Sequence, residues 1–318
     1  MPYQRNPDFV FSVLVDDELI KDYQPSGFVP EGNESFVSVV NDFEDDKWRI
    51  GKFLNFVIDN LKETALTAVE RAALVNREGE ILSRAANCLR IEECKDSNSR
   101  GSEIGEILLY GLMREYYGAL PAVPKIWHKQ NRQNTAKGAD SVHVVVKEDN
   151  QLERWLGEAK FYKNISGAIA KAVESVKDML SLAAIRKETA FVTDLEDLRI
   201  CLRKKYRDDA ETLWQGILKM LDGNTSIDLL KPNLHIPILL LHECDLTRSA
   251  TRFSEEYKQS IKNAHLKDAQ DYFKKQVEEL KDEISLYSAI HFHLVLFPVP
   301  SKESVVNGFY KRIEPFRE

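Results

Sequence analysis

Long apolar runs, closely spaced cysteines and glycine-rich nucleotide motifs are all missing from this sequence of 318 residues. No apolar run approaches the ~20 residues of a membrane helix, and the opening Met-Pro-Tyr-Gln-Arg-Asn-Pro lacks the apolar core of a signal peptide. The four cysteines have neither metal-ligand nor redox spacing. These absences argue against a membrane partner and a P-loop enzyme, and they predict a cytoplasmic protein with reduced thiols.

Acidic side chains are missing between residues 116 and 139, although the whole chain carries a net charge of −7. That negative charge argues against a protein that coats nucleic acid, but a binding footprint is local and needs only one basic surface. The acid-free segment supplies four candidate phosphate contacts, Lys125, Lys129, Arg132 and Lys137. We therefore predict a local DNA-binding surface in this segment.

The opposite bias occurs near the N-terminus, where residues 16–47 hold ten acids and only two lysines. Three interpretations of this acidic segment stay open. It is a surface that faces a partner, a guard over the basic surface, or simply a solvated face.

The segment from Gly138 to Tyr162 has the pattern of a β-hairpin, because two runs rich in β-branched and aromatic residues flank a polar turn at residues 147–151. Asp140 stands before the first run, and Glu158 and Lys160 lie near the end of the second. Residues two apart in a strand share a face. We therefore expect Glu158 and Lys160 to point the same way, with the side chain between them facing the opposite side.

Two carboxylates beside a lysine are suited to metal-dependent phosphodiester hydrolysis. Mg²⁺ is typically held by one or two carboxylates and several waters, so we predict Asp140, Glu158 and the carbonyl of Ala159 as ligands of Mg²⁺, with Mn²⁺ as the alternative ion. Lys160 would position the attacking water or offset developing charge. The structural alternative is an ion pair between Glu158 and Lys160, worth ~0.2–1 kcal/mol. Three more Glu-x-Lys copies, at residues 93–95, 256–258 and 279–281, show how weak the bare motif is.

The order of these residues resembles the PD-(D/E)xK nuclease superfamily, in which Asp opens one strand and Glu-x-Lys lies on the next. The resemblance implies an α/β fold with a mixed central sheet flanked by helices, that is, a restriction-endonuclease-like core. It also implies a helix before the hairpin, often with one more acid, and a second helix after it.

Both flanking helices are indicated by the apolar pattern. Ser102 is a candidate N-cap for a helix that runs to about Tyr117, and Pro121 and Pro124 are expected to end it. Glu106 is our first choice for the extra acid and Glu103 our second, although either could instead favour the helix dipole. After the hairpin an amphipathic helix runs from residue 165 to 183, with Lys163 before it as a further phosphate contact or a solvated charge.

The rest of the chain divides at a polar, turn-rich break near residues 95–101. We predict an N-terminal α/β segment over residues 1–100 and a nuclease core with C-terminal additions over residues 101–318. Strands are expected at residues 9–15, 125–128, 235–242 and 291–297, and helices at residues 53–69, 80–89, 198–221 and 255–286. Residues 235, 242, 291 and 293 are histidines, for which core positions are favoured over a zinc site.

The whole-chain pattern resembles more narrowly the nuclease subunit (HamA type) of the Hachiman anti-phage defence system. The residues that carry this resemblance are Gly-Ser-Glu-Ile-Gly-Glu-Ile-Leu-Leu at 101–109, Gly-Ala-Asp-Ser-Val-His at 138–143 and Gly-Glu-Ala-Lys at 157–160. It implies a Mg²⁺-dependent DNA endonuclease that associates with a helicase subunit. The alternatives are a non-catalytic nucleic-acid-binding or assembly subunit with a nuclease-like fold, and a processing subunit that acts on RNA.

Overall fold

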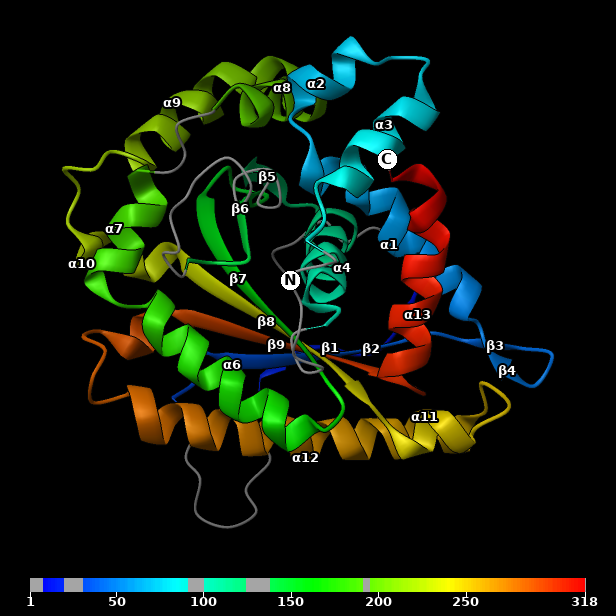
Figure 1. The fold of residues 1–318 in the computed structure, drawn as a ribbon. Helices are drawn as coiled ribbons and strands as arrows, with labels where there is room; N and C mark the ends of the chain where they lie inside the picture. Colours follow the sequence, from blue (N-terminus) through cyan, green and yellow to red (C-terminus); the bar gives the residue numbers. More distant parts are fainter. Residues whose placement is uncertain (1–7, 20–30, 91–99, 124–137, 191–194, 318) are drawn as a thin grey trace.

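The fold is built on one mixed sheet with helices on both faces (Figure 1). The computed structural model describes residues 8–19, 31–90, 100–123, 138–190 and 195–317. The sheet has seven strands in the order β1-β2-β9-β8-β7-β6-β5. Neighbours among β2, β9, β8 and β7 run parallel, and β1, β6 and β5 pair antiparallel at the two sides. This confirms the predicted mixed α/β class. The strands are β1 (Ser12–Leu19), β2 (Glu34–Val40), β5 (Leu120–Val123), β6 (Ser141–Val146), β7 (Leu152–Tyr162), β8 (Leu234–Glu243) and β9 (His291–Val299).

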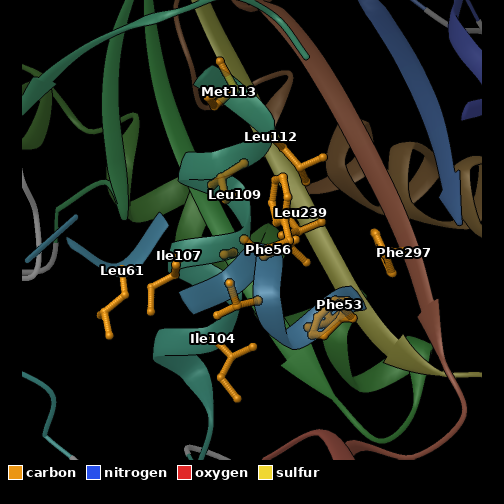
Figure 2. Packing of buried hydrophobic residues seen from close by; sticks show 14 of the residues in the cluster. Phe53, Phe56, Leu61, Ile104, Ile107, Leu109, Leu112, Met113, Leu239 and Phe297 are labelled. Carbon is orange, nitrogen blue, oxygen red and sulfur yellow. The ribbon is translucent and has the colours of Figure 1, made fainter. Parts of the chain in front are cut away.

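One face of the sheet, which we call the α4 face, is covered by helices from both ends of the chain. Apolar side chains of α1 and α4 pack there against β7, β8 and β9 (Figure 2). Phe53, Ile107 and Phe297 are fully buried in this cluster. The helices on this face are α1 (Ile50–Ala65), α3 (Glu78–Asn87), α4 (Ser102–Glu115) and α13 (Lys302–Ile313).

The other face, the α6 face, carries helices from the second half of the chain. Their apolar stripes pack on the strand residues that alternate with those of the α4 face, as strand geometry requires. The helices are α6 (Ile165–Met179), α7 (Leu182–Ala190), α8 (Leu195–Tyr206), α9 (Ala210–Met220) and α12 (Glu255–Leu280). Shorter elements complete the fold: α2 (Ala68–Ala73), α10 (Ile227–Leu230), α11 (Asp245–Ser249) and the small pair β3 (Phe43–Glu44) and β4 (Lys47–Trp48).

Several predicted boundaries were wrong. The first strand begins at Ser12 rather than residue 9, and the stripe over residues 53–69 belongs to two helices, α1 and α2, because Thr67 caps a new start. Ser102 is the first residue of α4 and not its cap, a position that Gly101 takes with a φ of 86°. Pro121 lies inside β5 instead of ending a helix, which is tolerated because β5 is an edge strand.

The predicted division at residue 100 separates segments that share one sheet. Strands β1 and β2 extend the sheet beyond β9, and α1 packs on α4 in the same apolar cluster. The strand predicted at residues 125–128 lies outside the described residues. The helices predicted at residues 80–89 and 255–286 correspond to α3 and α12, and the strands at 235–242 and 291–297 correspond to β8 and β9.

A buried hydrogen-bonded chain joins two carboxylates through two histidines at the N-terminal ends of β7, β8 and β9. Glu153 Oε1 lies 3.3 Å from His235 Nε2, His235 Nδ1 lies 2.8 Å from His293 Nε2, and His293 Nδ1 lies 3.0 Å from Asp17 Oδ1. Both imidazole rings stack on Trp155. The favoured core role of these histidines fits this arrangement, and the described residues hold no cluster of three or more His, Cys, Asp or Glu able to bind a metal.

Candidate active site

The predicted hairpin brings Asp140 close to Glu158 and Lys160, since its charge acts on both groups. Asp140 directly precedes β6, whose first residue, Ser141, pairs with Gly157 of β7 in the antiparallel register. The amide of Asp140 donates to the carbonyl of Gly157 at 2.7 Å. In return, the amide of Ala159 donates to Asp140 Oδ2 at 3.1 Å. Strand pairing and a side-chain hydrogen bond therefore both fix the position of Asp140.

Glu158 and Lys160 share the α6 face, as strand alternation predicts. Ala159 and Phe161 belong to the apolar cluster of the α4 face, whereas Leu156, two residues before Glu158, belongs to that of the α6 face. Lys160 Nζ forms an ion pair with Glu158 Oε1. Only 4% of Glu158 is exposed. The hairpin therefore holds a carboxylate and an ammonium group side by side in a nearly dry position.

The electrostatics of this position favour a bound cation. Burial, followed by repulsion from Asp140, raises the pKa of Glu158, and the opposing effects of Lys160 and a hydrogen bond from Ser175 only partly offset this rise. Burial alone would lower the pKa of Lys160, but attraction to Glu158 and Asp140 outweighs it, and the pKa rises. Two carboxylates thus compete for one ammonium group, and a divalent cation would relieve their repulsion.

The donor set fits Mg²⁺ better than a transition metal. Asp140 and Glu158 offer carboxylate oxygens, which hard cations prefer. Among the described residues no third His, Cys, Asp or Glu completes a cluster, so water would supply the remaining ligands of an octahedral ion. The amide of Ala159 is engaged with Asp140, and the proposed role of its carbonyl as a ligand stays a prediction.

The two helix acids lie on the opposite side of the sheet. Helix α4 packs closely on the α4 face of β7, where a Cβ built on Gly105 would lie 3.5 Å from the Cβ of Ala159. The helix therefore carries Glu106, which is 8% exposed, on the face away from Glu158 and Lys160. Glu103 accepts a hydrogen bond from the amide of Arg90 at 3.0 Å. A catalytic role for either acid stays a prediction.

The predicted phosphate contacts have two different outcomes. Four of them lie outside the described residues: Lys125, Lys129, Arg132 and Lys137. Lys163 is exposed between β7 and α6, and it lines a cavity of about 210 Å³ together with Arg100 and Lys302. Neither Arg100 nor Lys302 was predicted from the sequence. Arg100 precedes α4 and Lys302 begins α13, and only the packing of these two helices beside the end of β7 brings the two residues together.

Comparison with known proteins gives one family assignment. No curated protein matches the chain. The family model HamA matches residues 16–313. The chain belongs to the HamA family. This confirms the narrower resemblance drawn from the three motifs, and the wider placement in the PD-(D/E)xK superfamily stays a prediction. None of the described helices of this HamA-family protein is long and apolar enough to cross a membrane.

Proposed function

We propose that this HamA-family protein is a Mg²⁺-dependent DNA endonuclease. The observation that carries the proposal is that Asp140, at the entry to β6, lies beside the ion pair of Glu158 and Lys160 on β7. An ordinary surface ion pair would not need a carboxylate whose pKa is raised by burial and, after that, by a second carboxylate. Perturbed groups of this kind cluster at functional sites, and metal-assisted phosphodiester hydrolysis is the chemistry that this set of residues supports best.

Each residue has a distinct role in the proposed reaction. Asp140 and Glu158 would hold the metal ion, which when bound would activate a water molecule and stabilise the charge of the displacement. Lys160 would orient the attacking water through its ammonium protons, which its pairing with Glu158 keeps in place. The strands fix all three side chains, so little reorganisation is needed when substrate binds.

Membership of the HamA family supports the biological setting. We propose that the protein is the nuclease effector of the Hachiman anti-phage system and works with a helicase subunit that restrains or releases cleavage. The cytoplasmic location belongs to the same proposal.

Cleavage of plasmid and linear DNA by the full chain tests the proposed chemistry. Glu158→Ala and Lys160→Ala should each reduce Mg²⁺-dependent cleavage by at least about 100-fold, the usual scale for loss of a catalytic acid–base or charge-stabilising group. Glu256→Ala/Lys258→Ala is a matched control, because it removes a Glu-x-Lys copy from α12. It should cleave like the wild type.

Undiminished cleavage by both site variants would refute the assignment of these residues. DNA binding without cleavage under any metal condition, with and without the helicase subunit, would instead favour the non-catalytic role. An RNA substrate in parallel distinguishes the processing alternative.

A further inference from the structure

A small cationic cavity lies just beyond the end of β7. It is about 210 Å³ in volume and is lined by Arg100, Lys163, Lys302, Glu303, Val306 and Asn307. These residues come from three places in the chain: the start of α4, the link between β7 and α6, and the first two turns of α13. Three cations face one carboxylate in the lining, so the cavity is suited to an anion.

The buried cation is held in a fixed position. Lys302 is only 4% exposed, and its Nζ donates to the carbonyl of Phe161 at 2.7 Å. The same Nζ lies 5.2 Å from the centroid of the Phe161 ring and 5.7 Å from that of Tyr162. Because burial removes this ammonium group from bulk water, an anion in the cavity would interact with it in a low-dielectric setting.

Of the two outer cations, Arg100 is held in place by neighbouring side chains, whereas Lys163 is exposed. Arg100 Nη2 donates to Asn307 Oδ1 at 3.2 Å, and the guanidinium group lies 5.3 Å from the centroid of the Tyr310 ring. Arg100 is therefore oriented by neutral partners. Within the described ranges, neither Arg100 nor Lys163 forms an ion pair with an acid. Their charge thus remains available to a ligand.

The start of α4 adds to the positive potential of the cavity wall. Its N-cap, Gly101, supplies no side-chain cap and packs so closely on α13 that a Cβ there would lie 2.6 Å from Val306 Cγ2. The amide end of a 14-residue helix therefore stands beside Arg100. The arginine, the two lysines and this helix end together form a cradle for a phosphate group.

We propose that this cavity binds a backbone phosphate of the nucleic-acid strand, next to the cleavage centre but separate from it. The identity of the ligand rests on the proposed nuclease function. Among the described residues that line the cavity none is aromatic, so no base could stack there, and the group bound is the phosphate and not the base. Lys163 follows Lys160 by three residues, a reach of roughly 10 Å along an extended chain. The phosphate held is therefore a neighbour of the scissile one, and the cavity sets the register of the strand.

The experiment is a binding titration on the full chain in a Glu158→Ala background, with EDTA present, so that no cleavage interferes. A fluorescent DNA is titrated at several salt concentrations against Arg100→Ala/Lys163→Ala. Each lost phosphate contact should lower the salt slope by about one, and the double variant should bind roughly tenfold more weakly. The matched control Lys267→Ala/Lys274→Ala removes two exposed charges from α12 that do not line the cavity. It should retain the affinity and slope of its parent.

An affinity and salt slope equal to those of the control would overturn the proposal. A thermal melt tests whether each variant is folded. If the alanine variant is not folded, the titration is repeated with Arg100→Gln/Lys163→Gln. The outcomes separate the two proposals. Cavity-dependent binding by a protein that cleaves nothing would leave the phosphate site standing without the nuclease. If the wild type cleaves DNA with Mg²⁺ but the cavity variant binds DNA as tightly as its parent, only the proposed phosphate site is refuted.

Discussion

At the scale of single residues, the pairing of Glu158 with Lys160 opposes stability and favours chemistry. A carboxylate that is 4% exposed and repelled by Asp140 is expensive to keep ionised. Lys160 compensates for part of this cost. A fold selected for stability alone would place apolar side chains here, because the surrounding residues of β7 and β8 already form an apolar cluster.

Replacing both charges together should therefore stabilise the protein while abolishing its activity. Glu158→Leu/Lys160→Met keeps the volumes approximately and removes the buried ion pair, and replacement of such a pair by apolar residues is neutral or stabilising by ~1–4 kcal/mol. The free energy of unfolding is measured by urea denaturation beside the cleavage assay. Lys160→Met alone is the control, since it leaves Glu158 without its cation and should destabilise. A double variant less stable than this control would contradict the interpretation.

At the scale of elements, α1 and α4 approach each other closely because Gly111 has no side chain. A Cβ on Gly111 would lie 2.6 Å from Phe56 Cε1 and 2.8 Å from Asn60 Nδ2, both on α1. This contact sets the position of α4, the helix that carries Glu106 and begins at the cationic cavity. The close packing of these two helices is visible in Figure 2.

Gly111→Ala should destabilise the fold by ~1–3 kcal/mol, because the cost of overpacking exceeds the gain of up to ~1 kcal/mol in helix propensity. Gly79→Ala in α3 is the control, since a Cβ there would have no atom of the described residues within 4 Å. It should be neutral or slightly stabilising. Urea denaturation of both variants gives the comparison, and a shift of the same sign in both would argue against the close-contact explanation.

The elements that the sequence predicts best are those with strong local signals. The turn of the hairpin at residues 147–151 is seen in the hydrogen bond from the amide of Lys147 to the carbonyl of Gln151, 2.9 Å long, and in the positive φ of Asn150. Pro121 was misread because proline ends a helix and is also tolerated in an edge strand, and only the sheet order decides between the two. The parallel pairing of β7 with β8 and of β8 with β9 has no local signal at all.

At the scale of the whole molecule, buried histidines should make stability depend on pH. Burial lowers the pKa of His143 to about 3 and that of His242 to about 4. The unfolded chain takes up protons near pH 6.5, where the folded chain does not. The histidine contribution is therefore complete above pH 6.5 and is lost as the pH falls from 6.5 toward 4, by up to ~1.4 kcal/mol per pH unit for each group. Glu34, Glu158 and Asp268, whose pKa values burial raises, act in the opposite sense. Five histidines have lowered pKa values and outnumber these acids: His143, His235, His242, His265 and His291.

Urea denaturation at pH 7.5 and pH 5.0 measures this dependence. The free energy of unfolding should be lower at pH 5.0 for the wild type. In His143→Phe the difference between the two pH values should shrink, because one titrating group is removed. The His143 ring contacts Tyr110, and neither of its nitrogens has a hydrogen-bond partner among the described residues. An unchanged difference would show that His143 does not titrate as its burial implies.

Only part of the candidate site could be predicted from the sequence. The proximity of Asp140, Glu158 and Lys160 could be predicted because strand alternation and one hairpin are local geometry, and their catalytic role stays a prediction. Which face α4 covers depends on how segments far apart in the chain pack, and no spacing in the sequence encodes the position of Glu106 relative to the hairpin. Arg100 and Lys302 stand more than 200 residues apart and meet only through the topology.

In the hydrogen-bonded chain of Glu153, His235, His293 and Asp17, the number of contacts and the number of available hydrogens differ. Its three contacts, carboxylate to ring, ring to ring and ring to carboxylate, need three hydrogens. Two neutral imidazoles bring only two, since each has a single N–H. One contact therefore lacks a hydrogen unless the chain takes up a third proton. When both histidines change tautomer, the contact without a hydrogen moves from one end of the chain to the other. The two carboxylates, one on β1 and one on β7, thus draw on the same hydrogens, and neither histidine can be replaced without changing what the other must do.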